Sequence, residues 1–220
     1  MAEEFGYGIS PGPASRLPGV VGKIAAGDEQ WRKTRRTLAV WAGLTVGVVC
    51  FAVLSTVSDV RLAPGASTAV ILALVVVVGL LPTSLPPRRR EAREMVRNRP
   101  WQVWPCRMET VRGDASSPMV VADVLLLAPD RTVVAALRGF MRRSDWLATT
   151  DGRGLIWFCG DLRVGGWVAR PADAVGSLTW MDKVDPPARP VELTPSEAAL
   201  EDGVIHTAIS EQVWNLFFDL

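Results

Sequence analysis

The chain has 220 residues, 49% of them hydrophobic, and a formal net charge of +1. This near-neutral balance excludes a strongly basic nucleic-acid-binding chain and an acidic disordered one. Three widely spaced cysteines, Cys50, Cys106 and Cys159, and one histidine, His206, predict free thiols rather than a disulfide framework or a zinc site. We therefore expect no metal and no cofactor.

The N-terminal segment, residues 1–30, is rich in glycine and proline and shows neither helical nor strand periodicity. Such a composition buries too little apolar surface to offset the entropy lost on folding. The segment is expected to be disordered.

Two apolar runs follow, at residues 37–57 and 67–85, and neither contains a charged side chain. Each is long enough as a helix to cross about 30 Å of hydrocarbon. The runs predict a transmembrane hairpin over residues 31–87. The alternative, a pair of buried core helices, is disfavoured because so small a chain has little interior to enclose them.

Small residues recur every four positions in the first run, at Ala39, Gly43 and Gly47. In lipid, a face of small residues lets another helix approach closely. These three residues are predicted to form a helix-packing face. It would serve either the second helix of the hairpin or a partner helix from another chain.

Basic residues flank both runs, and a further Arg-rich stalk covers residues 88–100. Because Lys and Arg are retained on the cytoplasmic side, both termini are predicted to be cytoplasmic. The basic side chains would meet anionic lipid headgroups rather than nucleic acid, since no aromatic residues are interleaved with them. The predicted headgroup contacts are Arg35, Arg36, Arg88, Arg89, Arg90 and Arg93.

Residues 101–181 change to short β-branched and aromatic runs separated by Gly, Pro and Asp, which is typical of strands. A turn at residues 128–131 and another at 161–165 indicate hairpins, and Pro105 should lie at an edge or bulge. We predict a small, mostly antiparallel cytoplasmic β domain, arranged as a meander or a partly open barrel. Its expected strands are 102–111, 119–127, 132–138, 155–160, 165–170 and 177–181.

The tryptophans of this domain could form its core or an exposed recognition face, and the sequence leaves both readings open. The domain has scattered aspartates but no histidine to act as a base, so no catalytic residue is predicted. The tryptophans concerned are Trp101, Trp104, Trp146, Trp157, Trp167 and Trp180.

The last segment, residues 182–220, begins as a proline-rich linker, and Thr194 to Glu197 then form a capping box that starts a helix. The helix is amphipathic and acidic, so an anionic membrane would repel it. Its apolar face should dock on the β domain, enter a partner's groove or pair with itself. This face contains Ile205, Ile209, Val213, Trp214, Leu216 and Phe217.

Three stretches, RNRPWQVWPCR, VLLLAPD and GLIWFCGDLRVGGWVARP, resemble two-span membrane proteins of high-GC Gram-positive bacteria. The likeness covers the two apolar runs and the β domain. It implies a multi-pass protein of the bacterial cell membrane, and it supplies no activity and no site.

These observations lead to the hypothesis of a non-catalytic, membrane-anchored adaptor that holds a cytoplasmic protein partner at the membrane. The alternative is an accessory subunit of a transport, secretion or channel assembly, whose transmembrane helices make the essential contacts. Self-association is compatible with either function.

Overall fold

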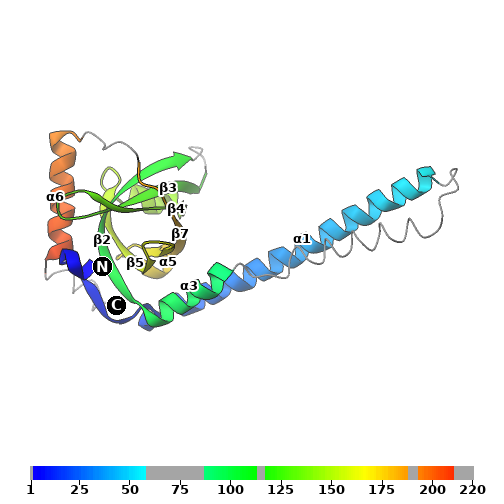
Figure 1. Ribbon diagram of the computed structural model, residues 1–220, viewed down its shortest axis with the longest axis horizontal. Helices are drawn as coiled ribbons and strands as arrows, with labels where there is room; N and C mark the ends of the chain where they lie inside the picture. Colours follow the sequence, from blue (N-terminus) through cyan, green and yellow to red (C-terminus); the bar gives the residue numbers. More distant parts are fainter. Residues whose placement is uncertain (1, 58–86, 113–116, 188–192, 211–220) are drawn as a thin grey trace. The chain divides into compact units, whose positions relative to one another are not determined.

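The computed structural model describes residues 2–57, 87–112, 117–187 and 193–210 (Figure 1). The chain divides into two compact units. One combines Met1–Val21 with Glu91–Leu220, and the other is Gly22–Arg90.

The unit Gly22–Arg90 contains most of helix α1 (Val20–Val57) and the start of α3 (Pro87–Asn98). The first half of α1 is charged, and Lys33 pairs with Glu29 one turn earlier at 2.8 Å. The run at 37–57 is therefore the later part of a longer helix of mixed polarity rather than a separate apolar element.

No helix in the described part of the chain combines the length and apolar character needed to cross a membrane. The prediction of a two-helix transmembrane hairpin over 31–87 is therefore wrong, and the predicted second run, 67–85, lies outside the described residues. The multi-pass bacterial membrane location, with both termini cytoplasmic, was inferred from that hairpin and is corrected with it.

The other unit is built on a β barrel. Of the strands that the structure describes, six close on themselves in the order β2-β3-β4-β7-β6-β5, and β5 pairs with β2 again. Every pairing is antiparallel. The strands are β2 (Pro100–Arg112), β3 (Met119–Leu127), β4 (Val133–Arg142), β5 (Arg153–Asp161), β6 (Gly165–Ala169) and β7 (Thr179–Val184).

The six strands overlap the six predicted ranges, but the predicted meander or partly open barrel is wrong, because the barrel is closed. Closure depends on two pairings between strands distant in sequence, β2 with β5 and β4 with β7. The long strand β2 allows it, since its residues 106–112 pair with β3 and its residues 102–107 pair with β5. Turn signals reveal only consecutive neighbours, so they could not show this closure.

Side chains fill the barrel interior, as expected for a barrel of few strands. Trp104, Ile156 and Phe158 are fully buried there. Gly160 and Gly166 face each other across β5 and β6, where a Cβ on either would lie 2.7 Å from the Phe158 ring. The two glycines make room for that ring.

The N-terminal segment has defined structure where the sequence predicted disorder. It forms η1 (Ala2–Phe5), β1 (Ile9–Pro13) and η2 (Ala14–Arg16). β1 pairs with the start of β2, and the buried Tyr7 hydroxyl donates to the Leu127 carbonyl at 2.9 Å. These tertiary contacts stabilise a segment whose local sequence has no helical or strand pattern.

Pro105 lies where β2 changes neighbours, after its pairing with β1 and just before its pairing with β3 at Cys106. On the other side of β2, Pro105 is paired with Leu155 of β5. The predicted turn at 128–131 is confirmed, since the Arg131 amide donates to the Ala128 carbonyl between β3 and β4.

Helix α6 (Pro195–Ile209) begins with the predicted capping box between Thr194 and Glu197. It packs on β2 and β5, along one side of the barrel (Figure 1). The buried Glu201 carboxylate lies 3.2 Å from Arg107 of β2 and 3.5 Å from Arg153 of β5, which also pairs with Glu197 at 3.0 Å. Docking on the chain's own β domain was one of the predicted alternatives for this helix.

Candidate functional site

A row of apolar side chains runs around the outer wall of the barrel. Successive side chains of a strand point to opposite faces, so the strand register places one outward residue of each strand at the same level. The register pairs Cys159 with Trp167, Trp167 with Trp180, and Val121 with Phe140. We call this set the outer row, and its members are Trp101, Cys159, Trp167, Trp180, Phe140 and Val121.

The chain itself covers one part of the outer row. In the stretch of α3 from Glu91, Ala92 and Val96 are buried, and the Ala92 carbonyl accepts a hydrogen bond from Trp167 Nε1 at 2.9 Å. The Cys159 thiol lies 3.6 Å from the Met95 carbonyl. A helix therefore already packs on the outer row over β5 and β6.

Over β7, β4 and β3, none of the described residues covers the outer row in this way. Phe140 is 64% exposed although it lies within a strand, and Met119, two residues before Val121, is 41% exposed. Trp180 and Val121 are half-buried. We call this surface the Phe140 patch; it consists of Met119, Val121, Phe140 and Trp180.

Ion pairs border the Phe140 patch on both sides. Arg138 makes two hydrogen bonds to the Asp123 carboxylate, at 2.6 and 2.7 Å. On the other side, Arg142 binds Asp145 and Asp173, each at 2.9 Å. The hydrogen bond from Arg142 holds the pKa of the Asp173 carboxyl below its usual value. An apolar centre with a polar rim is the usual anatomy of a protein interface.

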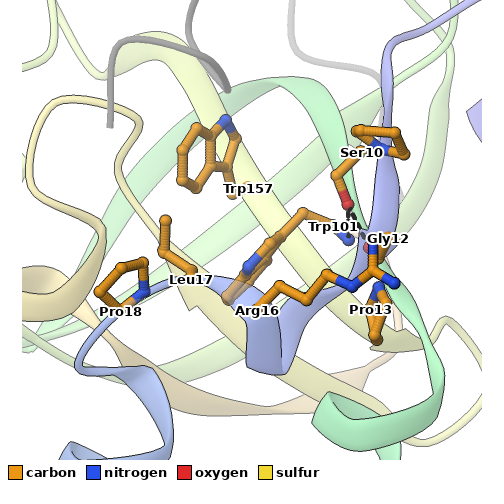
Figure 2. Close-up of a pocket in the computed structure, with 9 residues that line it drawn as sticks. Ser10, Gly12, Pro13, Arg16, Leu17, Pro18, Trp101 and Trp157 are labelled. Atoms are coloured by element: carbon orange, nitrogen blue, oxygen red, sulfur yellow. Dashed lines mark hydrogen bonds between the residues drawn. The ribbon is translucent and has the colours of Figure 1, made fainter.

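A cavity of about 220 Å³ opens between the N-terminal segment and the barrel wall (Figure 2). Trp101 of β2 and Trp157 of β5 form one side, with ring centroids 6.0 Å apart. Its remaining lining comes from residues 10–13 and 16–18. Trp101 is 2% exposed, and its Nε1–H has no acceptor among the described residues.

The predicted helix-packing residues lie in α1. Ala39 is half-buried, while Gly43 and Gly47 are exposed. A Cβ built at either glycine would meet no other side chain or segment within 4 Å. In the described structure, therefore, no element packs closely on that face.

The predicted headgroup arginines are only partly described. Arg36 and Arg93 are exposed. The side chains of Arg35, Arg88, Arg89 and Arg90 lie outside what the structure describes.

Only two residues of the predicted partner-binding face of the C-terminal helix are described, and they differ in burial. Ile205 is buried against the barrel, whereas Ile209 is 47% exposed. Val213, Trp214, Leu216 and Phe217 lie outside the described residues.

The titratable groups of the barrel are engaged in its structure. Burial raises the pKa of the Cys106 and Cys159 thiols to about 12, so both are protonated and poorly nucleophilic at neutral pH. The Arg163 side chain holds the pKa of Asp161 far below its usual value. Within the described residues, no group of three or more His, Cys, Asp or Glu is placed to bind a metal ion.

Sequence reasoning identified neither the Phe140 patch nor the cavity. Phe140 lies beyond the predicted strand 132–138, and only the register of the longer strand β4 places it on the outside. The sequence left open whether the tryptophans form the core or an exposed recognition face. Three of them are buried, Trp101, Trp104 and Trp157, and three are half-buried, Trp146, Trp167 and Trp180.

In comparisons with known proteins, no family model, no curated protein and no solved structure matches this chain. Any functional assignment must therefore come from the geometry of the barrel.

Proposed function

We propose that this chain is a non-catalytic adaptor that binds a helix of a protein partner on the Phe140 patch. The observation that carries the proposal is the 64% exposure of Phe140, which lies within the barrel strand β4. Burying a phenylalanine side chain contributes about 1.5 to 3 kcal/mol. Large aromatic side chains with a polar rim are also the residues that dominate binding energy at interfaces.

A helix is favoured as the occupant because α3 already packs on the adjoining part of the outer row. Strands lie about 4.8 Å apart, so the uncovered part over β7, β4 and β3 is roughly 10 Å wide. This width corresponds to the diameter of one helix with its side chains, about 10 Å. A partner helix lying beside α3 would extend a packing arrangement that the chain already uses.

The rim further defines the partner's chemistry. The carboxylates of Asp123 and Asp173 already neutralise Arg138 and Arg142, so an apolar helix face needs no matching charge at its centre. We therefore expect a partner helix with apolar anchors at i, i+3 and i+4 and an otherwise polar surface.

The proposal is tested by affinity purification with Phe140→Glu and a matched control, Val164→Glu. Val164 is also an exposed apolar residue, at 41%, but it lies in the turn between β5 and β6. One stoichiometric protein should co-purify with the wild-type chain and with Val164→Glu, and be lost with Phe140→Glu. The purified pair should then re-form a one-to-one complex that a peptide of the partner's helix displaces.

Two results would overturn the proposal. One is a partner retained equally by Phe140→Glu and Val164→Glu. The other is a concentration-dependent dimer in sedimentation velocity that Phe140→Glu abolishes, because a second copy of the chain would then be the occupant.

A further inference from the structure

We infer that Arg107 and Arg153 form a binding site for a phosphate group, and that helix α6 covers this site with its own carboxylate, Glu201. The site lies on the barrel wall where α6 packs on β2 and β5, whereas the Phe140 patch lies over β7, β4 and β3. The inference therefore does not depend on the adaptor proposal. It makes α6 a removable cover rather than a permanent part of the barrel.

The two arginines lie directly opposite each other on neighbouring strands. The register of β2 and β5 pairs Arg107 with Arg153, and both residues are buried. Like charges in directly opposed positions destabilise a sheet, and the repulsion is stronger where water is excluded. The pair therefore needs an anion beside it.

Glu201 supplies that anion, but it leaves donors of the pair unused. One carboxylate oxygen, Oε1, lies 3.2 Å from Arg107 Nη1 and 3.5 Å from Arg153 Nε. The other oxygen, Oε2, is buried and makes no hydrogen bond with the described residues, and the same is true of the two arginine Nε atoms. A guanidinium binds an oxyanion best through two parallel N–H···O bonds. The site therefore offers more than this carboxylate accepts.

A phosphate group matches the two guanidinium groups in charge and in number of acceptors. It carries about −1.5 to −2 charges at neutral pH and three strongly accepting oxygens. Glu197, which lies 3.0 Å from Arg153, belongs to α6 and leaves the site with it. Glu109 of β2 stays, 3.4 Å from Arg107, but its side chain is 42% exposed and can turn to solvent. Arg153 also donates to the Asp151 carbonyl at 2.8 Å, which keeps its guanidinium oriented without α6.

The remaining attachment of α6 is small. The buried residues of the helix are Glu201, Ile205 and Ala208, so a single large apolar side chain anchors it. A further ion pair, Arg131 with Asp202 at 3.6 Å, is exposed, and such pairs contribute little to stability. Replacing a buried ion pair by apolar residues is often neutral or stabilising, so a charge at the centre of the interface suits reversible attachment. Elements with few buried apolar contacts also open more readily than the core.

The first experiment measures the binding of inorganic phosphate to the Glu201→Gln variant of the full chain by titration calorimetry. The amide keeps the size of the side chain and removes its charge, so phosphate should bind in the millimolar range. The double variant Glu201→Gln/Arg153→Gln should bind phosphate about tenfold more weakly, as expected for a lost charge-assisted hydrogen bond. Circular dichroism verifies that each variant is folded.

Asp123→Asn is the matched control. It removes the carboxylate that pairs with Arg138, but the residues opposite Arg138 in the sheet are Asp123 and Asp182 rather than a second arginine. Asp123→Asn should therefore bind phosphate at least about tenfold more weakly than Glu201→Gln.

The second experiment tests whether phosphate displaces α6 in the wild-type chain. Amide hydrogen exchange over residues 195–209 is compared in sodium phosphate and in sodium chloride at the same ionic strength and pH. A ligand that binds only the open form multiplies its population by 1 + [L]/Kd, so phosphate at about ten times the Kd should accelerate exchange in α6 about tenfold. Exchange in the barrel strands should not change. If Glu201→Gln does not fold, a phosphate titration of this wild-type exchange tests the site.

A phosphate group can belong to a free compound or to a modified protein side chain. Binding of a phosphoserine hexapeptide to Glu201→Gln at least about tenfold more tightly than inorganic phosphate assigns a protein side chain, and equal or weaker binding assigns a free compound. The inference is overturned if α6 exchanges equally in phosphate and in chloride, or if Asp123→Asn binds phosphate as tightly as Glu201→Gln. Loss of partner binding by Phe140→Glu would leave these results unchanged.

Discussion

Glu201 offers the sharpest test of how α6 is held on the barrel. Its side chain is fully buried, and one carboxylate oxygen serves both Arg107 and Arg153, whose side chains are also buried. Replacing Glu201 with alanine would leave two buried guanidinium groups without their shared partner.

The expected magnitude follows from those contacts. Removing one member of a buried ion pair typically destabilises a protein by about 3 to 5 kcal/mol. Here Arg153 keeps Glu197 and Arg107 keeps Glu109, so we expect the lower end, about 3 kcal/mol. Glu109→Ala is the matched control. It removes a partly exposed partner of Arg107, and its cost should stay below about 1 kcal/mol.

Urea unfolding followed by circular dichroism gives the free energy of unfolding of Glu201→Ala and of Glu109→Ala. Amide hydrogen exchange over residues 195–209 shows whether α6 detaches from the barrel. Glu201→Ala should accelerate exchange in α6 while the strands of the barrel stay protected. The reasoning is refuted if the two variants lose equal stability, or if α6 exchanges at the wild-type rate in Glu201→Ala.

Three further predictions concern the barrel itself. Asp161→Asn should destabilise the protein at pH 7. The deficit should shrink as the pH falls below about 4, because stability from a depressed folded pKa is fully present above the unfolded pKa and is lost as the pH falls from there toward the folded pKa. Unfolding midpoints across pH test this. Gly160→Ala should cost about 1 to 3 kcal/mol in thermal unfolding, since its Cβ would lie 2.5 Å from the Gly165 carbonyl oxygen. Cys106 and Cys159 should react with a thiol reagent only at the rate of unfolding, because both are buried with raised pKa values; a reaction complete within seconds in native buffer would contradict this.

The local sequence predicted the parts of the fold that depend on local signals. Strand periodicity, the turn at Ala128–Arg131 and the capping box at Thr194 are each encoded within a few residues, and the structure contains them. Barrel closure is not local, because the β4–β7 pairing joins Gly139 to Met181 across two intervening strands. The transmembrane prediction is wrong because no helix in the described part of the chain is long and apolar enough to cross a membrane, and residues 37–57 belong to the longer helix α1.

The candidate sites were harder to predict for a related reason. Whether Phe140 faces inward or outward depends on a one-residue register, which a hydrophobic run does not specify. The cavity likewise needs the N-terminal segment to lie against Trp101, and its glycine- and proline-rich sequence favoured disorder. Both features arise from contacts between distant parts of the sequence.

The most direct test of the adaptor role is photo-crosslinking from position 140 in cells of the source organism. A benzophenone amino acid at position 140 should yield one discrete crosslinked product with a partner protein, mapped to an amphipathic helix of that partner. The same amino acid at Arg163, whose side chain is 86% exposed, should yield none. Crosslinks of equal yield and pattern from both positions would contradict a binding surface at Phe140.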